Sequence, residues 1–353
     1  MRVERLELED VEGRLERPAP GGQAGWTFRR GVRIRLHAQG LVGLGESAPL
    51  PGYSVETLSE VRAALVEVGA RELVVEPAAP VCECLARALR TIPSELPCAR
   101  FGLETALLDL LSRLRGVPVH RLLRGDAPPP RLPVAALLMG EDVVDVVKEA
   151  GRALEVGAAA LKFKLAGDRG WARVEAVRSA LPDATLRLDF NQGLSRRALR
   201  PALERAARLG VELVEEPTQA WSWDHAAPPP CRVFADESLR EQTARRELPS
   251  RVAAGELAGA VLKPALLGGL SSCLELAEQV RAAGGECFVT HLFDGPVARA
   301  ACAELALALG AGPAHGLAPH VGLGIWPGFE AAAVSGYRIT SHDRPGLGQE
   351  REA

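Results

Sequence analysis

The chain has 353 residues, of which 47% are hydrophobic and 25% charged, and its formal net charge is -3 at pH 7. This length suggests roughly two domains of ordinary size, or one barrel with an addition, and the composition suits a globular protein with a sizeable core. The small negative charge provides no basic field for nucleic acid or for an acidic membrane surface. We therefore expect neither nucleic acid nor a membrane among the partners.

The cysteines and the N-terminal segment bear on location. The seven cysteines show no paired CxxC spacing, which favours free thiols in a reducing compartment over a zinc site. The segment MRVERLELED is charged from its second residue and lacks the apolar core of a signal peptide. No uncharged apolar stretch approaches the ~20 residues that a membrane-spanning helix needs. We expect a cytoplasmic location.

The first section of the chain has an α+β pattern. Segments 2–8 and 31–37 alternate apolar and polar residues, as half-buried strands do. A Gly-rich turn then leads into LVGLGESAPLPGYS at 41–54. Helical periodicity follows over 55–69, 82–90 and 101–115. The Pro-rich stretch 127–133 marks a boundary, so we predict a separate α+β domain over 1–126.

Beyond this boundary, short apolar runs recur at intervals of roughly 20–28 residues, as in βαβ units. We predict strands at 134–138, 161–165, 186–189, 213–216, 233–236, 261–263 and 288–291. Most intervals have a helix-like pattern, as in 141–156, 170–180, 196–209 and 271–283. A run of this length favours a closed (β/α)7β barrel, here over 127–320, and no GxGxxG or GxxxxGK[ST] motif follows a strand. The tail beyond about Ser341 is expected to be frayed or surface-bound.

An ionisable residue follows nearly every predicted barrel strand. In chain order these residues are Lys162 and Lys164, Asp189, Glu215, Asp236 and Lys263. From Lys164 onward, successive residues of this series are separated in sequence by about one βα unit. The carboxyl ends of all parallel barrel strands lie at the same end of the barrel. We therefore expect the six side chains to meet at the mouth of the barrel.

Physical chemistry indicates what such a group can do. Charges that point into a barrel are costly unless they are paired or bound to a metal. Three carboxylates on consecutive strands form an oxygen-only site that suits Mg2+ or Mn2+ and is poor for zinc. A lysine on either side can exchange a proton with a substrate if burial and the metal lower its pKa.

The motifs KxK, LDxN, EEP, ADES and LKP, in that order and spacing, resemble the muconate-lactonising branch of the enolase superfamily. The resemblance implies that the first domain caps the barrel and that segment 321–353 packs back on the cap. It implies Mg2+, replaceable by Mn2+, on Asp189, Glu215 and Asp236. Lys164 is then the general base on one face of a small carboxylate substrate, and Lys263 stands opposite.

Within that branch, GLGESAPLPGYSVETL resembles the capping loop of o-succinylbenzoate synthases, enzymes of menaquinone synthesis. The resemblance implies a syn dehydration in which Lys164 removes the proton α to a carboxylate and Mg2+ stabilises the enediolate. The same lysine then assists loss of the hydroxyl, while Lys263 acts as a cation. Tyr53 and Ser54 lie in the loop that would close over the succinyl part.

Some residues permit two interpretations. Lys162 either orients the substrate carboxylate or tunes its neighbour, and Asn191 either supports the substrate site or forms a turn. Arg187 either points into the barrel as a partner of Asp189 or forms a structural ion pair. The stretch VTHLFDGPVARAA departs from the Ser-rich seventh strand of many such synthases, and it places His291 and Asp294 in a region that usually lines the substrate pocket.

Other functions stay open. Racemisation of N-acylamino acids uses the same residues, with both lysines as bases. A barrel without catalysis, acting as a binding protein, is disfavoured by the intact set of charged strand ends, and muconate cycloisomerisation is a further alternative. The Asp-x-Asp of dipeptide epimerases is missing from 315–322, which argues against that reaction. The sequence does not indicate the oligomeric state.

Overall fold

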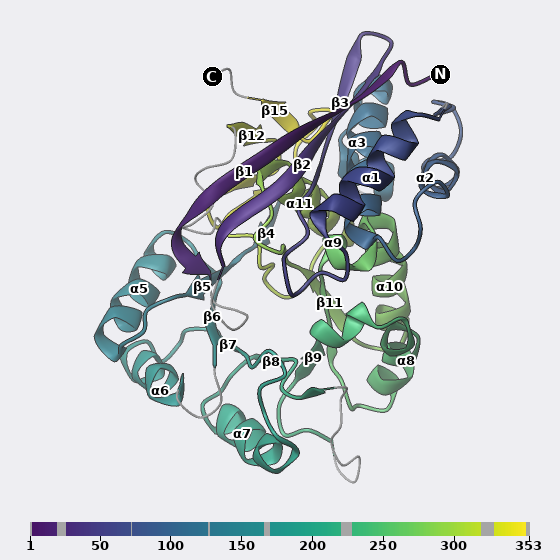
Figure 1. The fold of residues 1–353 in the computed structure, drawn as a ribbon. Coiled ribbons are helices and arrows are strands. Elements are labelled where there is room, and N and C mark those ends of the chain that lie inside the picture. The colour runs from purple at the N-terminus through teal and green to yellow at the C-terminus, as the bar shows by residue number, and fades with distance from the viewer. Residues whose placement is uncertain are drawn as a thin grey trace.

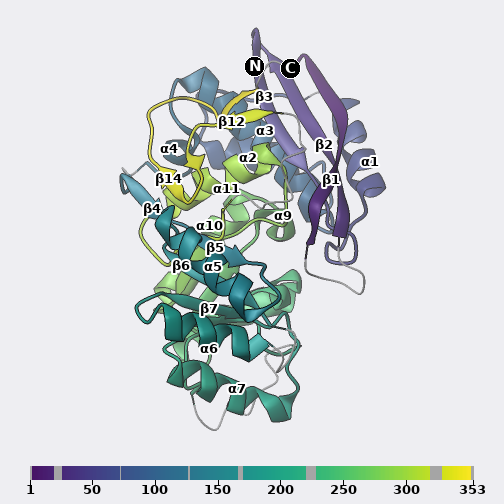
Figure 2. The ribbon, with the colours of Figure 1, turned by 90° about the vertical axis from the view of Figure 1, so that its left-hand side faces the viewer.

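The computed structural model describes residues 2–19, 26–71, 73–125, 128–165, 170–219, 228–318 and 328–350. Two sheets dominate this part of the chain: a three-stranded antiparallel sheet and a seven-stranded parallel sheet. Figure 1 shows the long ribbon of the first sheet lying across the upper part of the barrel, with helices around the second sheet. The view from the side separates the two parts more clearly (Figure 2).

The N-terminal part consists of a meander and the helices that cover it. Its strands are β1 (Arg5–Ala19), β2 (Trp26–Ala38) and β3 (Leu41–Ser47). Its helices are α1 (Leu58–Gly69), α2 (Val81–Leu89), α3 (Pro97–Arg115) and α4 (Val119–Leu123). Helix α1 begins at a capping box, in which the side chains of Thr57 and Glu60 each accept a hydrogen bond from the other's backbone N–H. The two predicted strands are confirmed and are longer than expected.

Strand β3 forms where a Gly-rich turn was expected to lead into a loop. A Cβ atom on Gly43 would lie 2.3 Å from the carbonyl oxygen of Ala106, and one on Gly45 would lie 2.2 Å from that of Gly102. Glycine is therefore required for the close approach of β3 to α3. The same glycines interrupt the apolar alternation by which a strand is recognised.

The barrel follows the predicted alternation. Its strands are β5 (Ala135–Leu138), β6 (Ala160–Lys164), β7 (Leu186–Asp189), β8 (Leu213–Glu215), β9 (Val233–Ala235), β10 (Gly259–Leu262) and β11 (Glu286–Val289). Its helices are α5 (Val143–Glu155), α6 (Trp171–Ala180), α7 (Arg196–Arg208), α8 (Gln242–Ala253), α9 (Pro264–Leu267), α10 (Leu270–Ala282) and α11 (Pro296–Leu309). Parallel bridges from His315 to Val134 and from Gly316 to Thr290 join the two edge strands. The predicted barrel class is confirmed.

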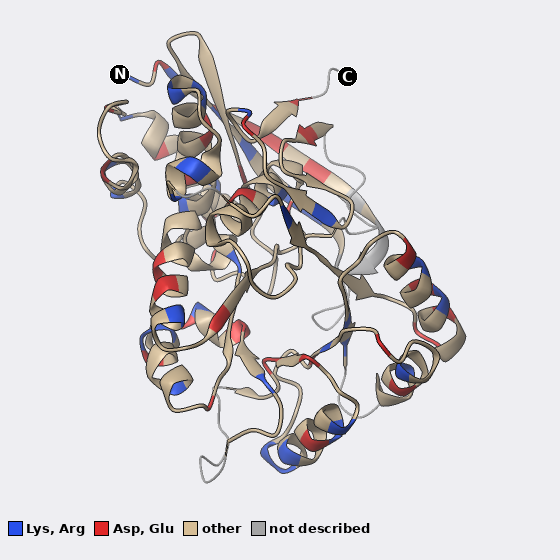
Figure 3. Ribbon diagram, turned by 180° about the vertical axis from the view of Figure 1, so that it is seen from behind, with Lys and Arg blue, Asp and Glu red and all other residues tan. Residues whose placement is uncertain are grey.

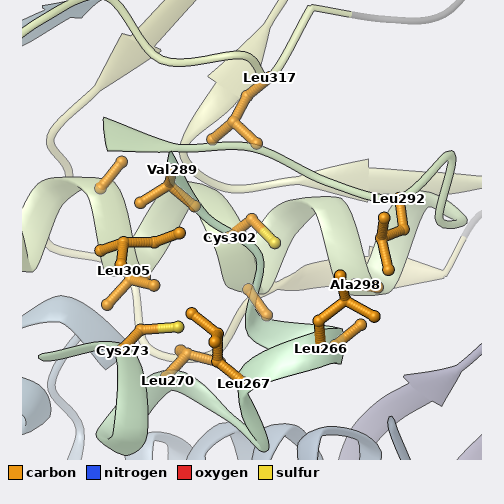
Figure 4. Close-up of a cluster of buried hydrophobic side chains, with 14 of the residues drawn as sticks. Leu266, Leu267, Leu270, Cys273, Val289, Leu292, Ala298, Cys302, Leu305 and Leu317 are labelled. Carbon is orange, nitrogen blue, oxygen red and sulfur yellow. The ribbon is translucent and has the colours of Figure 1, made fainter. Parts of the chain in front are cut away.

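Apolar packing fixes the position of the strand ends. Leu266 and Leu270, near the start of α9 and α10, pack with Val289 of β11 and with Cys302 and Leu305 of α11 (Figure 4). Full burial of one such side chain stabilises the fold by about 1.5–3 kcal/mol. This packing therefore stabilises the part of the barrel wall that precedes and follows β11.

The C-terminal segment is ordered where it is described. Its strands are β12 (Phe329–Ala331), β13 (Val334–Ser335), β14 (Arg338–Thr340) and β15 (Gly348–Glu350), and β14 pairs with β4 (Arg131–Pro133). Leu347 is buried, and its N–H donates to Asp109 of α3 at 2.6 Å. Glu350 accepts from Arg33 of β2 at 3.0 Å. Of the two expectations for this tail, frayed or surface-bound, the described residues fit the second, because α3 and β2 supply their partners.

The surface and the thiols agree with the composition. Figure 3 shows basic and acidic residues interspersed along the outer helices of the barrel. Among the described residues, no helix combines the length and apolarity that crossing a membrane requires. All seven cysteines are free thiols, and five of them are buried.

Candidate active site

Three carboxylates meet at the mouth of the barrel, as predicted. Asp189 and Glu215 are the last residues of β7 and β8 and are paired in register, while Asp236 directly follows β9. Their oxygen atoms lie within 4.8 Å of one another, and all three side chains are buried. Ionised carboxylates this close repel one another unless cations neutralise them.

Lysines flank the carboxylates on both sides. On β6, Lys162 Nζ lies 2.9 Å from Asp189 Oδ2 and 2.5 Å from Glu215 Oε2. Beyond the opposite side, Lys263 directly follows β10, and its Nζ lies 2.6 Å from Asp236 Oδ1. Lys164 Nζ is more distant, at 4.0 Å from Asp189 Oδ2. The strand order β10-β9-β8-β7-β6 places the carboxylates between the lysines.

The lysines differ in electrostatic environment. Burial lowers the pKa of Lys164, and the nearby charges of Lys162 and Lys263 lower it further against the attraction of Asp189. Burial also opposes the charge on Lys263, yet Asp236 and Glu237 outweigh it and raise the pKa of that lysine. The two lysines are thus not equivalent.

The carboxylates fit a hard divalent cation. Glu215 Oε1 is buried and accepts no hydrogen bond from any residue that the structure describes. A buried, unpaired carboxylate oxygen is costly, and oxygen atoms are the ligands that Mg2+ prefers. An oxygen-only donor set held on three adjacent strands therefore suits Mg2+ better than zinc.

The loop after β3 reaches the candidate site through Tyr53. The Tyr53 hydroxyl accepts a hydrogen bond from Lys263 Nζ at 2.7 Å and donates one to Glu237 Oε1 at 3.1 Å. Arg240 stacks over the ring at 5.1 Å and donates to the Tyr53 carbonyl at 3.0 Å. The hydroxyl of Ser54 instead accepts from the N–H of Leu50 at 2.9 Å, within its own turn.

A cavity of about 140 Å³ lies beside these groups. Its charged lining includes Lys162, Lys164, Asp189 and Lys263, and its other walls come from the cap loop, β5, the segment after β11 and the segment that closes the barrel. Tyr53 lines it, whereas Ser54 and Asn191 are not among its lining residues. A larger hollow of about 810 Å³ between cap and barrel helices contains none of the predicted site residues.

Asn191 donates hydrogen bonds to two carboxylates of the site. Its backbone N–H donates to Asp189 Oδ1 at 2.9 Å, and its side-chain Nδ2 donates to Glu237 Oε1 at 2.7 Å. Glu216, the second glutamate of EEP, accepts from the N–H of Asp236 at 2.6 Å. Glu216 and Glu237 were not predicted to have roles, although each directly follows a predicted ligand in its motif.

The residues with two interpretations are also placed. Lys162 contacts two of the carboxylates, which favours tuning of its neighbours. Arg187 Nε lies 2.5 Å from Glu212 Oε2, and its guanidinium stacks 4.9 Å from the Phe288 ring, as in a structural ion pair. His291 lines the cavity, whereas Asp294 is buried and is not among the lining residues. Segment 315–322 was predicted to lack the Asp-x-Asp of dipeptide epimerases, and its residues 319–322 lie outside the described part.

Family comparisons agree with this arrangement. Residues 23–124 match the mandelate racemase / muconate lactonizing enzyme N-terminal domain, and residues 145–352 match the enolase C-terminal domain-like family. The chain belongs to the enolase superfamily. It is 29% identical over 307 residues to a chloromuconate cycloisomerase of Cupriavidus pinatubonensis, covering 84% of this chain and 81% of the relative. It is 30% identical over 294 residues to an o-succinylbenzoate synthase of Yersinia pseudotuberculosis, covering 79% of this chain and 78% of the relative.

Solved structures of the superfamily share the fold. A dipeptide epimerase from Methylococcus capsulatus, complexed with Mg and the dipeptide L-Arg-D-Lys, is 26% identical, with a TM-score of 0.88 over 99% of both chains. An N-succinyl Arg/Lys racemase from Bacillus cereus is 20% identical, with a TM-score of 0.85 over 98% of this chain and 94% of that chain. The relatives thus include lyases and isomerases.

Proposed function

We propose that this enzyme is an o-succinylbenzoate synthase, which converts 2-succinyl-6-hydroxy-2,4-cyclohexadiene-1-carboxylate to 2-succinylbenzoate and water in menaquinone biosynthesis. The similarity to o-succinylbenzoate synthases and the cap loop that carries Tyr53 support this assignment. A cytoplasmic location suits the free thiols. The proposal includes a cap over 1–126, a barrel over 127–320 and a returning segment over 321–353.

The proposal assigns Mg2+ to Asp189, Glu215 and Asp236, with Mn2+ able to replace it. When bound, the cation would offset two of the three carboxylate charges and would stabilise negative charge that develops on the substrate carboxylate. Lys162 lies against Asp189 and Glu215, so it holds two of these ligands in place.

The observation that carries the proposal is the unequal surroundings of the two catalytic lysines. Lys263 is held by Asp236 at 2.6 Å and by the Tyr53 hydroxyl at 2.7 Å. Lys164 lines the cavity, and its Nζ lies 4.0 Å from Asp189 Oδ2. A syn elimination needs one lysine that moves a proton and one that stays a fixed cation, and the unequal contacts of Lys164 and Lys263 support this division of roles.

In the proposed reaction, Lys164 acts twice on one face of the substrate. Lys164 takes the proton α to the carboxylate, and the electron pair of the broken C–H bond moves into an enediolate. The protonated Lys164 returns that proton to the departing hydroxyl, so water leaves and the ring becomes aromatic. Lys263 remains a cation beside the enediolate, and Tyr53 keeps its ammonium in position.

Racemisation of N-acylamino acids is the second candidate. Both lysines line the cavity from strands on opposite sides of the carboxylates, as a two-base reaction requires. The similarity to a dipeptide epimerase also favours an isomerisation. In this reaction, Lys263 would deliver a proton to the face opposite Lys164.

One experiment separates the two candidates. Purified enzyme with Mg2+ is incubated in D2O with the dehydration substrate and, separately, with N-succinylamino acids of either configuration. The proposal predicts rapid appearance of the aromatic product by its ultraviolet absorption, and slow or absent α-deuteration of the amino acids. Fast deuteration without dehydration would overturn the synthase assignment in favour of a racemase. A protein without either activity would contradict both.

A further inference from the structure

The cavity has two walls from distant parts of the sequence. Leu50 and Tyr53 belong to the loop that follows β3 of the cap, whereas His291, Leu292 and Phe293 belong to the segment that follows β11 of the barrel. The shape of the cavity depends on how these two segments lie relative to each other. A residue that binds both of them would therefore control that shape.

Arg29 of β2 is such a residue. Its Nη1 donates to the carbonyl of Pro49 at 3.0 Å, and its Nη2 donates to that of Ala48 at 2.5 Å. Toward the barrel, Nε donates to the carbonyl of Phe293 at 3.0 Å, and Nη2 makes a longer contact of 3.4 Å with that of Leu292. Its side chain is 1% exposed, so water does not compete for these bonds.

Asp294 completes this link and accounts for a residue that the sequence leaves without a role. Its Oδ1 lies 3.9 Å from Arg29 Nη2, and its Oδ2 accepts from the N–H of Leu292 at 2.9 Å. Between them, Phe293 has a φ of 53°, in the left-handed region that residues with a side chain rarely adopt. Such a conformation persists when neighbouring contacts hold it, and Arg29 and Asp294 provide those contacts.

We propose that Arg29 is a positioning residue that locks the cap loop and the segment after β11 into one arrangement, and so sets which acyl tail the cavity accepts. The proposal rests on the proposed function in so far as it takes the cavity as the substrate site. A lysine cannot replace Arg29, because one ammonium on a flexible stem cannot reach carbonyls on both walls as a planar guanidinium does.

The test compares Arg29→Lys with Arg30→Lys. Arg30 is the next residue on the same strand, is exposed and pairs with Glu12 at 3.1 Å, so it controls for the loss of a guanidinium. Backbone hydrogen exchange is followed by mass spectrometry in peptides that contain Ala48–Tyr53 and Leu292–Asp294. We expect faster exchange in both segments for Arg29→Lys and in neither for Arg30→Lys. Faster exchange in one segment alone, or equal behaviour of the two variants, would overturn the proposal.

Steady-state kinetics test how the loss of Arg29 affects substrate turnover. Misplacement of a substrate by about 1 Å can reduce the rate on the order of 10²-fold, so kcat/KM of Arg29→Lys should fall by 10- to 100-fold. The fall should be larger for substrates with a long acyl tail than for truncated ones; an equal fall for both would contradict the specificity role.

Asp294→Asn keeps an acceptor for Leu292 but lacks the charge, and should show a smaller change of the same kind. If wild type neither dehydrates nor racemises, the proposed function fails, while the exchange experiment still decides the role of Arg29.

Discussion

The described part of the chain holds two groups of side chains, buried except for the partly buried His342, whose possible metal-ligand atoms lie within 4.8 Å of one another. One is the carboxylate trio at the barrel mouth, and the other consists of His120, Glu304 and His342. In the second group, His120 Nδ1 lies 2.8 Å from Glu304 Oε2, and His342 Nε2 lies 2.7 Å from Glu304 Oε1. Both oxygens of Glu304 thus have donors, whereas Glu215 Oε1 has none among the described residues.

The difference shows that residue type alone does not define a reactive site. Burial opposes ionisation of Glu304, yet its hydrogen bonds from the two histidines lower its pKa. The pKa of Asp236 moves in the opposite direction. Burial raises it to about 6, and the nearby charge of Lys263 offsets only part of this rise. The histidine group joins α4, α11 and the C-terminal segment, whereas one member of the carboxylate trio, Asp189, lines the cavity. We therefore expect the first group to stabilise the fold and the second to bind a cation.

Metal removal should have the largest effect. We expect chelation to abolish turnover and Mg2+ or Mn2+ to restore it, because the proposed reaction needs the cation to stabilise the negative charge that develops on the substrate carboxylate. Activity assays before and after treatment with a chelator, with metal analysis of the protein, check this. Bound zinc with cysteine ligands would contradict the assignment of the trio.

Loss of the proposed base should come next. Removal of a general acid–base group reduces the rate on the order of 10²–10⁴-fold, and Lys164→Ala removes a group used twice. The exposed Lys148 of α5 supplies the matched control, since Lys148→Ala should keep its activity. Lys263→Ala should also be severely impaired. Near-normal rates in Lys164→Ala, with an intact circular dichroism spectrum, would show that another group is the base.

The sequence predicts the barrel and the trio for a physical reason. Parallel strands buried on both faces appear as continuous apolar runs, and a charge at the end of each run marks the strand terminus. The pairing of Arg29 with Phe293 spans 264 positions, and that of His120 with Glu304 spans 184. No local pattern marks such partners, because they meet only after the cap has docked on the barrel. The resemblance of its loop to the synthase cap places Ser54 at the substrate, whereas its hydroxyl accepts a hydrogen bond within its own turn.

Glu46 of β3 extends the comparison to a buried carboxyl that lies against Gly295, just before α11. Burial and the nearby Asp294 raise its pKa from 4.5 to about 7, and Arg33 offsets only part of this. The folded protein therefore holds this proton more tightly than the unfolded chain, so stability is lost as the pH rises from about 4.5 through 7. At pH 8, Glu46→Gln should be more stable than wild type by up to about 3 kcal/mol, and at pH 4 the difference should vanish. Urea unfolding at both pH values checks this; a difference that does not depend on pH would contradict it.

Glu304→Gln should cost stability without affecting catalysis. The amide group would face one of the histidine N–H donors, and a buried unsatisfied donor costs about 1–3 kcal/mol. Denaturant unfolding should show this loss, while kcat and KM of the folded enzyme stay at wild-type values. A selective fall in kcat at unchanged stability would assign a catalytic role to the histidine group.

A calorimetric Mg2+ titration of wild type, Glu215→Gln and Glu304→Gln tests the central claim most directly. The account predicts one Mg2+ per chain in wild type, its loss or severe weakening in Glu215→Gln, and near wild-type affinity in Glu304→Gln. Mg2+ binding that survives Glu215→Gln but disappears in Glu304→Gln would contradict the account, because the cation would then belong to the histidine group.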